Sequence, residues 1–379
     1  MTFSDVRLQQ AHAAIAALFL CLGLNYGTWA ARIPALKAQL GINDAQLGFF
    51  LLASGLGAVF SFPLTAWVLQ WFGTRKVCLF AVSGLPLVLL ALSAVENYAL
   101  AIVIMLAEGV LASCLNVAMN TQAVEFEQAS GKMIMSRLHA IFSLGLLAAA
   151  MLAYMLVQHA TPVLGWHFGL AAAMIVLGAL YAGPRLIPSE PAAVGSGSGR
   201  RFVLPAGAAV GFGLLAFCGT IVEGSMNDWS ALYLKDVAGV SQQLATLGLA
   251  AFSTTMFLAR WFGDGWRLRF GARTLLVAGG LLSGGGLLLG IVAGGYVAGL
   301  LAFALIGVGM AAVSPCVYQG AAKHGAVTLA AVTTMGSVGA LLGPPLIGFV
   351  AHTTSLSFGM GLVACMALFI AILARVVRW

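Results

Sequence analysis

This chain contains few charged residues. Asp, Glu, Lys and Arg make up 8% of its 379 residues, whereas an average soluble domain carries about 25%. Hydrophobic residues make up 61%, and the mean hydropathy is +1.02. A soluble fold has no way to hide so much apolar surface. One crossing of a bilayer needs about 20 apolar residues, so the composition predicts a protein that crosses a membrane many times.

Other absences narrow the function. The six cysteines lie in apolar stretches and no two form a CxxC pair, so we expect small core side chains and no disulfide framework or metal site. Gly307-Val308-Gly309 lacks the strand and polar context of a nucleotide-binding loop. We therefore expect no metal, no cofactor and no enzymatic activity. The net charge of +7 needs no nucleic-acid partner, because its placement along the chain accounts for it.

Apolar stretches predict an all-α membrane protein with twelve transmembrane helices and short loops. Dividing 379 residues by twelve leaves about 31 for each helix and its loop, close to the length of one crossing plus a turn. The predicted spans are 11–34, 47–70, 77–95, 99–124, 138–158, 167–187, 204–232, 244–263, 274–293, 297–321, 328–350 and 357–376.

Basic residues are distributed unequally between the two sides of these helices. If both termini lie on one side, fifteen of the eighteen Lys and Arg residues, Arg260 included, fall on that side. Only Arg32, Lys37 and Lys235 fall opposite. Because loops rich in Lys and Arg stay in the cytoplasm, we expect both termini to be cytoplasmic and the chain to be a multi-pass protein of a bacterial inner (plasma) membrane.

The chain also contains an internal repeat. Residues 188–203 begin with Pro-Ser-Glu-Pro and continue into a Gly/Ser-rich stretch, a composition typical of linkers. They separate a half at 1–187 from a half at 204–379, each with six predicted helices. Trp29 and Trp229 end the first helix of each half, and similar residues follow both. Repetition on this scale indicates duplication of a six-helix unit.

A Gly-x-Arg loop follows the second helix of each half. It contains Gly73 and Arg75 in the first copy, and Gly271 and Arg273 in the second. With the two halves and the linker, this loop resembles the signature of the major facilitator superfamily along essentially the whole chain. The resemblance implies a cytoplasmic latch formed by these four residues and Asp264, although Ala66 stands where the first copy should carry its own Asp.

A closer resemblance is to the fucose-permease-like branch of bacterial inner-membrane carriers. Four segments carry it: Trp29-Ala-Ala-Arg-Ile-Pro34, Asn116-Val-Ala-Met-Asn120, His139-Ala-Ile-Phe-Ser-Leu-Gly145 and Glu223-Gly-Ser-Met-Asn-Asp-Trp229. The acids of that permease's first and fourth helices fall near Ala30 and Asn116. Its proton pathway therefore does not transfer residue by residue.

Polar residues inside the predicted spans are the candidate site residues. A charge in hydrocarbon costs roughly 2.5–3.5 kcal/mol on insertion scales, so it usually marks a transport pathway or a proton relay. Glu223, and after it Glu108, are the proton-coupling candidates, because burial lets a carboxyl group change its charge. The candidates for a substrate cavity are Asn25, Trp29, Arg32, Asn116, Asn120, His139, Asn227, Asp228, Ser314, Tyr318 and Gln319.

Several of these residues admit a second interpretation. Arg32 either pairs with Asp228 or Glu108, or extends to the lipid headgroups. Glu223 is either a proton carrier or a structural, paired side chain. The asparagines suit hydroxyl-rich ligands but also bridge helices, and His139 suits either packing or cavity lining. Gly343-Pro344-Pro345 is expected to break its helix.

Together these observations predict a secondary active transporter that moves a small polar organic solute by alternating access. The resemblance favours a sugar or sugar acid, and the buried carboxylates favour proton coupling. The expected partners are the solute, the proton and the lipid bilayer, and the expected state is a monomer. Two alternatives stay open: an efflux antiporter of amphipathic compounds, and a membrane receptor or scaffold that transports nothing.

Overall fold

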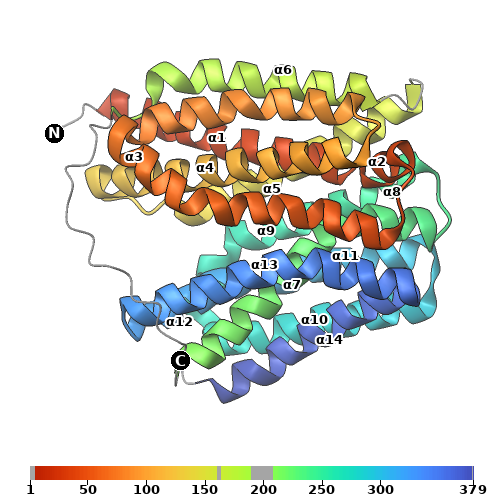
Figure 1. The fold of residues 1–379 in the computed structure, drawn as a ribbon. Coiled ribbons are helices and arrows are strands. Elements are labelled where there is room, and N and C mark those ends of the chain that lie inside the picture. The colour runs from red at the N-terminus through yellow and green to blue at the C-terminus, as the bar shows by residue number, and fades with distance from the viewer. Residues whose placement is uncertain (1–4, 160–163, 189–207, 378) are drawn as a thin grey trace. The chain divides into compact units, whose positions relative to one another are not determined.

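The computed structural model describes residues 5–159, 164–188, 208–377 and 379, and every regular element in these residues is a helix (Figure 1). The helices are α1 (Asp5–Ala30), α2 (Ile33–Leu40), α3 (Asp44–Ala94), α4 (Tyr98–Ser130), α5 (Met135–His159), α6 (Leu164–Ala182), η1 (Gly183–Arg185), α7 (Ala208–Asp236), α8 (Gln242–Ala245), α9 (Leu247–Phe270), α10 (Ala272–Ala293), α11 (Gly295–Met310), α12 (Val313–Lys323), α13 (Ala326–Thr353) and α14 (Leu356–Val376).

Each of the twelve predicted spans overlaps one or two helices of the described chain. Eleven helical segments of the described chain are long and apolar enough to cross a membrane. The remaining predicted span, 244–263, falls on α9, where Arg260, Arg267 and Arg269 shorten the apolar stretch. The all-α class and the twelve-helix fold are therefore confirmed. Residues 189–203, most of the predicted linker, lie outside the described part of the chain.

Proline explains two differences from the predicted spans. The first span ends at Ala30 instead of residue 34, and α2 begins at Ile33 with Pro34 in its first turn. Proline fits a first turn but clashes with the preceding turn of a helix interior. Pro315 lies in the same way in the first turn of α12, so the span predicted at 297–321 is divided into α11 and α12.

The predicted break at Gly343-Pro344-Pro345 is wrong, because α13 continues through both prolines. Instead, α13 makes a close contact there: a Cβ on Gly48 would lie 3.0 Å from both the Pro344 carbonyl oxygen and the Pro345 Cα. The carbonyls that prolines leave without a partner are tolerated within a membrane when neighbouring segments cover them. The sequence spacing does not reveal this close contact of α13 with the segment around Gly48.

The two signature loops are single-residue breaks at glycine. Gly73 has φ 74° and ψ 163°, and Gly271 has φ 77° and ψ 156°. This region of backbone space is essentially restricted to glycine. The helices predicted at 47–70 and 77–95 are therefore two helices that meet at Gly73, and the label α3 covers both of them. The repeat seen in the sequence has the same backbone geometry in both copies.

The described chain forms two compact units. The first consists of Met1–Trp29 with Ala53–Arg200, and the second of Ala30–Leu52 with Arg201–Trp379. The stretch from Ala30 to Leu52 lies in the predicted first half of the sequence, yet it packs with the second unit. There Lys37 contacts both Asp44 and Asp236.

Candidate functional site

Within the first unit, α3 and α4 cross at very short range beside Glu108. A Cβ on Gly109 would overlap the Ser54 carbonyl oxygen, and a Cβ on Gly57 would overlap the Leu106 carbonyl oxygen. Only glycine permits this approach, and such crossings of small residues are a common way to pack helices in membranes. The crossing brings the Ser54 side chain to the carboxylate of Glu108.

Glu108 is buried, with 1% of its surface exposed. The Ser54 hydroxyl donates a hydrogen bond to Glu108 Oε2 at 2.6 Å, and Asn25 Nδ2 donates to Oε1 at 3.2 Å. The Trp29 side chain lies near this carboxylate, but its Nε1 makes no hydrogen bond of normal geometry with the described residues. In the described part of the chain, no Lys, Arg or His lies within ion-pairing distance of it. We call Glu108, Asn25 and Ser54 the carboxylate cluster.

Glu223 in the second unit has a different environment. Its Oε1 lies 2.8 Å from Nη2 of Arg260, and the two side chains are 24% and 11% exposed. Arg260 comes from α9, and the Tyr318 side chain of α12 lies within electrostatic range of Glu223. This carboxylate therefore has a cationic partner, in accord with the paired interpretation of Glu223.

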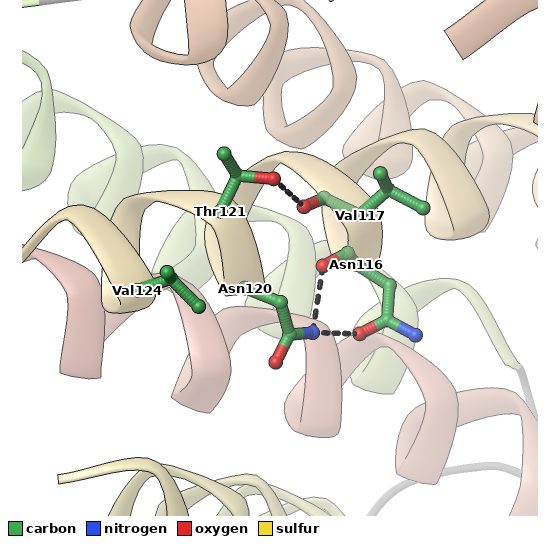
Figure 2. Close-up of a pocket in the computed structure, with 5 residues that line it drawn as sticks. All are labelled: Asn116, Val117, Asn120, Thr121 and Val124. Carbon is green, nitrogen blue, oxygen red and sulfur yellow. Dashed lines mark hydrogen bonds between the residues drawn. The ribbon is translucent and has the colours of Figure 1, made fainter. Parts of the chain in front are cut away.

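Asn116 and Asn120 lie on one face of α4. Asn120 Nδ2 donates to the Asn116 carbonyl oxygen at 2.8 Å and to Asn116 Oδ1 at 2.7 Å, and Figure 2 shows both bonds. The two amides line an open pocket of about 440 Å³ with three further α4 residues, Val117, Thr121 and Val124. Amides can both donate and accept, so this face suits a ligand that carries hydroxyl groups.

The polar residues near the start of α2 and the end of α7 are buried in the second unit. Arg32 is 2% exposed, Asp228 4% and Asn227 8%. Arg32 is thus covered by protein, which excludes the interpretation that it extends to the lipid headgroups. Trp229 is also fully buried, and so is Trp29 in the first unit, where the Tyr26 ring packs against it edge-on at 4.6 Å.

The remaining candidates are less enclosed or serve in packing. His139 lies edge-on to the Phe19 ring at 5.3 Å. In α12, Ser314 and Tyr318 are half-buried and Gln319 is exposed. Five cysteines are buried as expected, but Cys365 is exposed, so its prediction as a core side chain is wrong; the outward face of an apolar helix accepts it because lipid is also apolar.

The signature-loop arginines bind the end of the last helix of their own unit. Arg75 Nε donates to the Gly183 carbonyl oxygen at 3.0 Å, just after α6. Arg273 Nη2 donates to the Arg375 carbonyl oxygen at 2.8 Å, in the last turn of α14. Carbonyls at a helix C-terminus lack intrahelical partners, so the two arginines satisfy equivalent groups. The side chain of Asp264 lies outside the described part, and its role as a latch stays a prediction.

Two contributors were missed by sequence reasoning. Ser54 follows Ala53, which has the small-xxx-small spacing to Gly57, and this signal for close helix packing points to the segment that contains Ser54. Arg260 was counted with the basic loops although it falls inside the span predicted at 244–263. A basic residue inside a span is itself a sign of an intramembrane acid partner.

The fold and these intramembrane polar clusters are those of a multi-pass membrane transporter. The family follows from comparison with known proteins: residues 15–326 match the model of the Major Facilitator Superfamily, and the chain belongs to that family. It is 35% identical to an uncharacterised MFS-type transporter of Yersinia pestis over 95% of this chain and 94% of that protein. It is also 30% identical to the membrane protein MosC of Rhizobium meliloti over 90% of this chain and 84% of that protein.

Solved structures share the fold at low identity. A mutant form of the nucleoside transporter NupG aligns with a TM-score of 0.77 and 15% identity over 98% of this chain and 100% of that chain. A mutant form of the fucose:proton symporter FucP of E. coli aligns with a TM-score of 0.66 and 18% identity over 97% and 98%. These likenesses support the Major Facilitator fold.

Proposed function

We propose that this transporter is a secondary active carrier of the bacterial plasma membrane that couples a small polar organic solute to protons by alternating access. The observation that carries the proposal is the environment of Glu108. Its carboxylate is buried and held by neutral donors, the Ser54 hydroxyl and the Asn25 amide. A carboxylate without a cationic partner loses the least when it is neutralised, so it is suited to binding and releasing a proton.

This reasoning ranks Glu108 above Glu223. Neutralising Glu223 would remove the negative charge that lies 2.8 Å from the Arg260 guanidinium. That step loses the attraction between two opposite charges, whereas neutralising Glu108 loses only hydrogen bonds from neutral donors. We therefore assign proton coupling to Glu108 and a structural or solute-responsive pair to Glu223 and Arg260.

The solute is inferred from the amides. Asn116 and Asn120 present donors and acceptors to an open pocket on α4, which matches a hydroxyl-bearing molecule better than a hydrophobic one. NupG is a nucleoside transporter and FucP a fucose:proton symporter by name. Sugars, sugar acids and nucleosides are accordingly the classes to try first, with the carrier acting as a monomer.

The test begins with a thermal-shift panel of these three classes on the purified protein. The best stabilising compound is then used as a radiolabelled probe in proteoliposomes. Wild-type protein should accumulate it along an imposed proton gradient. Glu108→Gln should lose accumulation yet keep counterflow exchange. The glutamine amide has the volume and the hydrogen-bonding capacity of glutamate, but it cannot gain or lose a proton. The matched control is Glu96→Gln, since Glu96 is exposed in the turn before α4.

The outcomes separate the alternatives. A Glu108→Gln carrier that still concentrates the probe with the wild-type pH response would remove Glu108 from coupling and promote Glu223. Accumulation driven by a proton gradient of the opposite direction would identify an efflux antiporter. Binding without any flux in either direction would favour a receptor or scaffold.

A further inference from the structure

One buried group in the carboxylate cluster has no hydrogen-bond partner. Asn25 is fully buried, and its Oδ1 is without a partner among the described residues, while its Nδ2 donates to Glu108. Buried amide oxygens are nearly always hydrogen-bonded. An acceptor left open next to a buried acid therefore calls for an explanation.

The two protonation states of Glu108 have opposite requirements. An ionised carboxylate only accepts hydrogen bonds, whereas a protonated carboxyl group has one O–H to donate. The arrangement observed here suits the ionised form, because Ser54 and Asn25 both donate to it. The protonated form needs a nearby acceptor in place of one donor. Rotation of the Asn25 amide about its last side-chain bond would exchange Nδ2 for Oδ1 and supply that acceptor.

Resting on the proposed role of Glu108, we infer that Asn25 is a two-position switch that holds the Glu108 side chain in both protonation states. In the ionised state its N–H donates to Glu108 Oε1. When a hydronium ion delivers a proton to Oε1 and leaves as water, the amide turns and its Oδ1 accepts the new O–H. Ser54 donates to Oε2 throughout. Each state then keeps two hydrogen bonds, and Asn25 acts as a positioning residue.

Placement in the fold supports the switch. Asn25 belongs to α1 and Glu108 to α4, and the hydrogen bond between them joins residues 83 apart in the sequence. The α1 backbone packs closely against α5 at this level, because a Cβ on Gly27, half a turn further on, would meet both the Leu146 backbone and the Ala149 side chain. Turning the amide requires no displacement of the helix.

Infrared spectroscopy of the reconstituted full-length protein tests the switch without knowledge of the solute. The carbonyl band of protonated Glu108 is assigned as the band that titrates in wild type and is lost in Glu108→Gln. If Oδ1 accepts the proton of the acid, Asn25→Leu should shift this band to higher wavenumber, because the acid loses its acceptor. Ser54→Ala should shift it little. Asn227→Leu, the same change at a buried asparagine of the second unit, should leave it unmoved.

A second measurement follows the amide in place of the acid. With ¹³C-labelled asparagine, one side-chain carbonyl band should shift in step with the Glu108 titration and be missing in Asn25→Leu. An acid band that stays in place in Asn25→Leu but moves in Ser54→Ala would assign the acceptor to Ser54 and overturn the switch. That result leaves proton coupling itself intact, since coupling is judged separately by the accumulation assay on Glu108→Gln.

Discussion

At the scale of single residues, the charges of Glu108 and Glu223 are stabilised in two different ways. Glu223 has a guanidinium 2.8 Å away, so the pair is held as two charges. Glu108 has only neutral donors, so its charge is stabilised by hydrogen bonds alone. A pair loses stability when either member is removed, because the other charge is then left poorly solvated. A hydrogen-bonded acid loses much less on neutralisation.

This difference predicts the stability of variants. Glu223→Gln should lower the free energy of unfolding by up to about 3 kcal/mol, the low end for buried pairs, because Glu223 keeps some exposure to water. Arg260→Gln should have a similar effect, and the double variant should recover most of the loss. Apparent melting temperatures in detergent measure this. If the double variant lost as much stability as the two single variants added together, Glu223 and Arg260 would not be a coupled pair.

At the scale of elements, a glycine contact sets the geometry of the carboxylate cluster. Gly109→Ala should force α3 and α4 apart, because the new Cβ would overlap the Ser54 carbonyl oxygen. We expect a loss of about 1–3 kcal/mol, typical of overpacking, together with loss of proton-driven accumulation. Gly169→Ala in α6 is the control, since nothing lies within 4 Å of a Cβ there. Equal melting temperatures for both variants would show that the crossing is tolerant.

A second element-scale feature is the contact of Lys37, in α2, with the start of α3 and the end of α7. Lys37 Nζ lies 2.6 Å from Asp44 Oδ1 and 3.2 Å from Asp236 Oδ2. Partial burial alone would lower the pKa of Lys37, but hydrogen bonds and charges from Asp44 and Asp236 outweigh burial and raise this pKa. Because the pKa is higher in the folded state, the contact stabilises the fold below the unfolded value of roughly 10.4 and is lost as pH rises through the folded value.

Lys37→Met should therefore lower the melting temperature by the same amount at pH 7 and pH 9, and its deficit should shrink as pH rises through the raised pKa of Lys37. The effect is small, about 1 kcal/mol or less for exposed ion pairs, and should shrink with added salt. Lys235→Met is the control, because Lys235 directly precedes Asp236 at the end of α7. A deficit that persists unchanged at the highest pH would mean that packing of the lysine stem is responsible.

At the scale of the whole molecule, the distribution of basic residues sets the expected orientation. The sequence places fifteen Lys and Arg residues on the cytoplasmic side, and Arg260 is one of them. In the structure, Arg260 of α9 pairs with Glu223 of α7, so fourteen cytoplasmic basic residues remain. Three still lie opposite. The asymmetry continues to favour cytoplasmic termini, and the orientation stays a proposal.

Cysteine labelling of intact cells checks this orientation. In a Cys365→Ser background, which removes the exposed cysteine, Val237→Cys after α7 should react with a membrane-impermeant maleimide, and Lys132→Cys between α4 and α5 should react only after lysis. Both positions are exposed. The reverse pattern would place the termini outside the cell.

By itself, the sequence determined the all-α class, the approximate positions of the membrane-spanning stretches and the family. These follow because a bilayer requires long apolar runs and because glycine alone adopts the backbone of the breaks at Gly73 and Gly271. It also identified Glu108 and Glu223, since a charge is conspicuous in such runs. Only the tertiary structure decided their partners. Those depend on which helices cross and how closely, and glycines such as Gly109 permit that approach without specifying it. The tertiary structure also decided that α13 continues through two prolines.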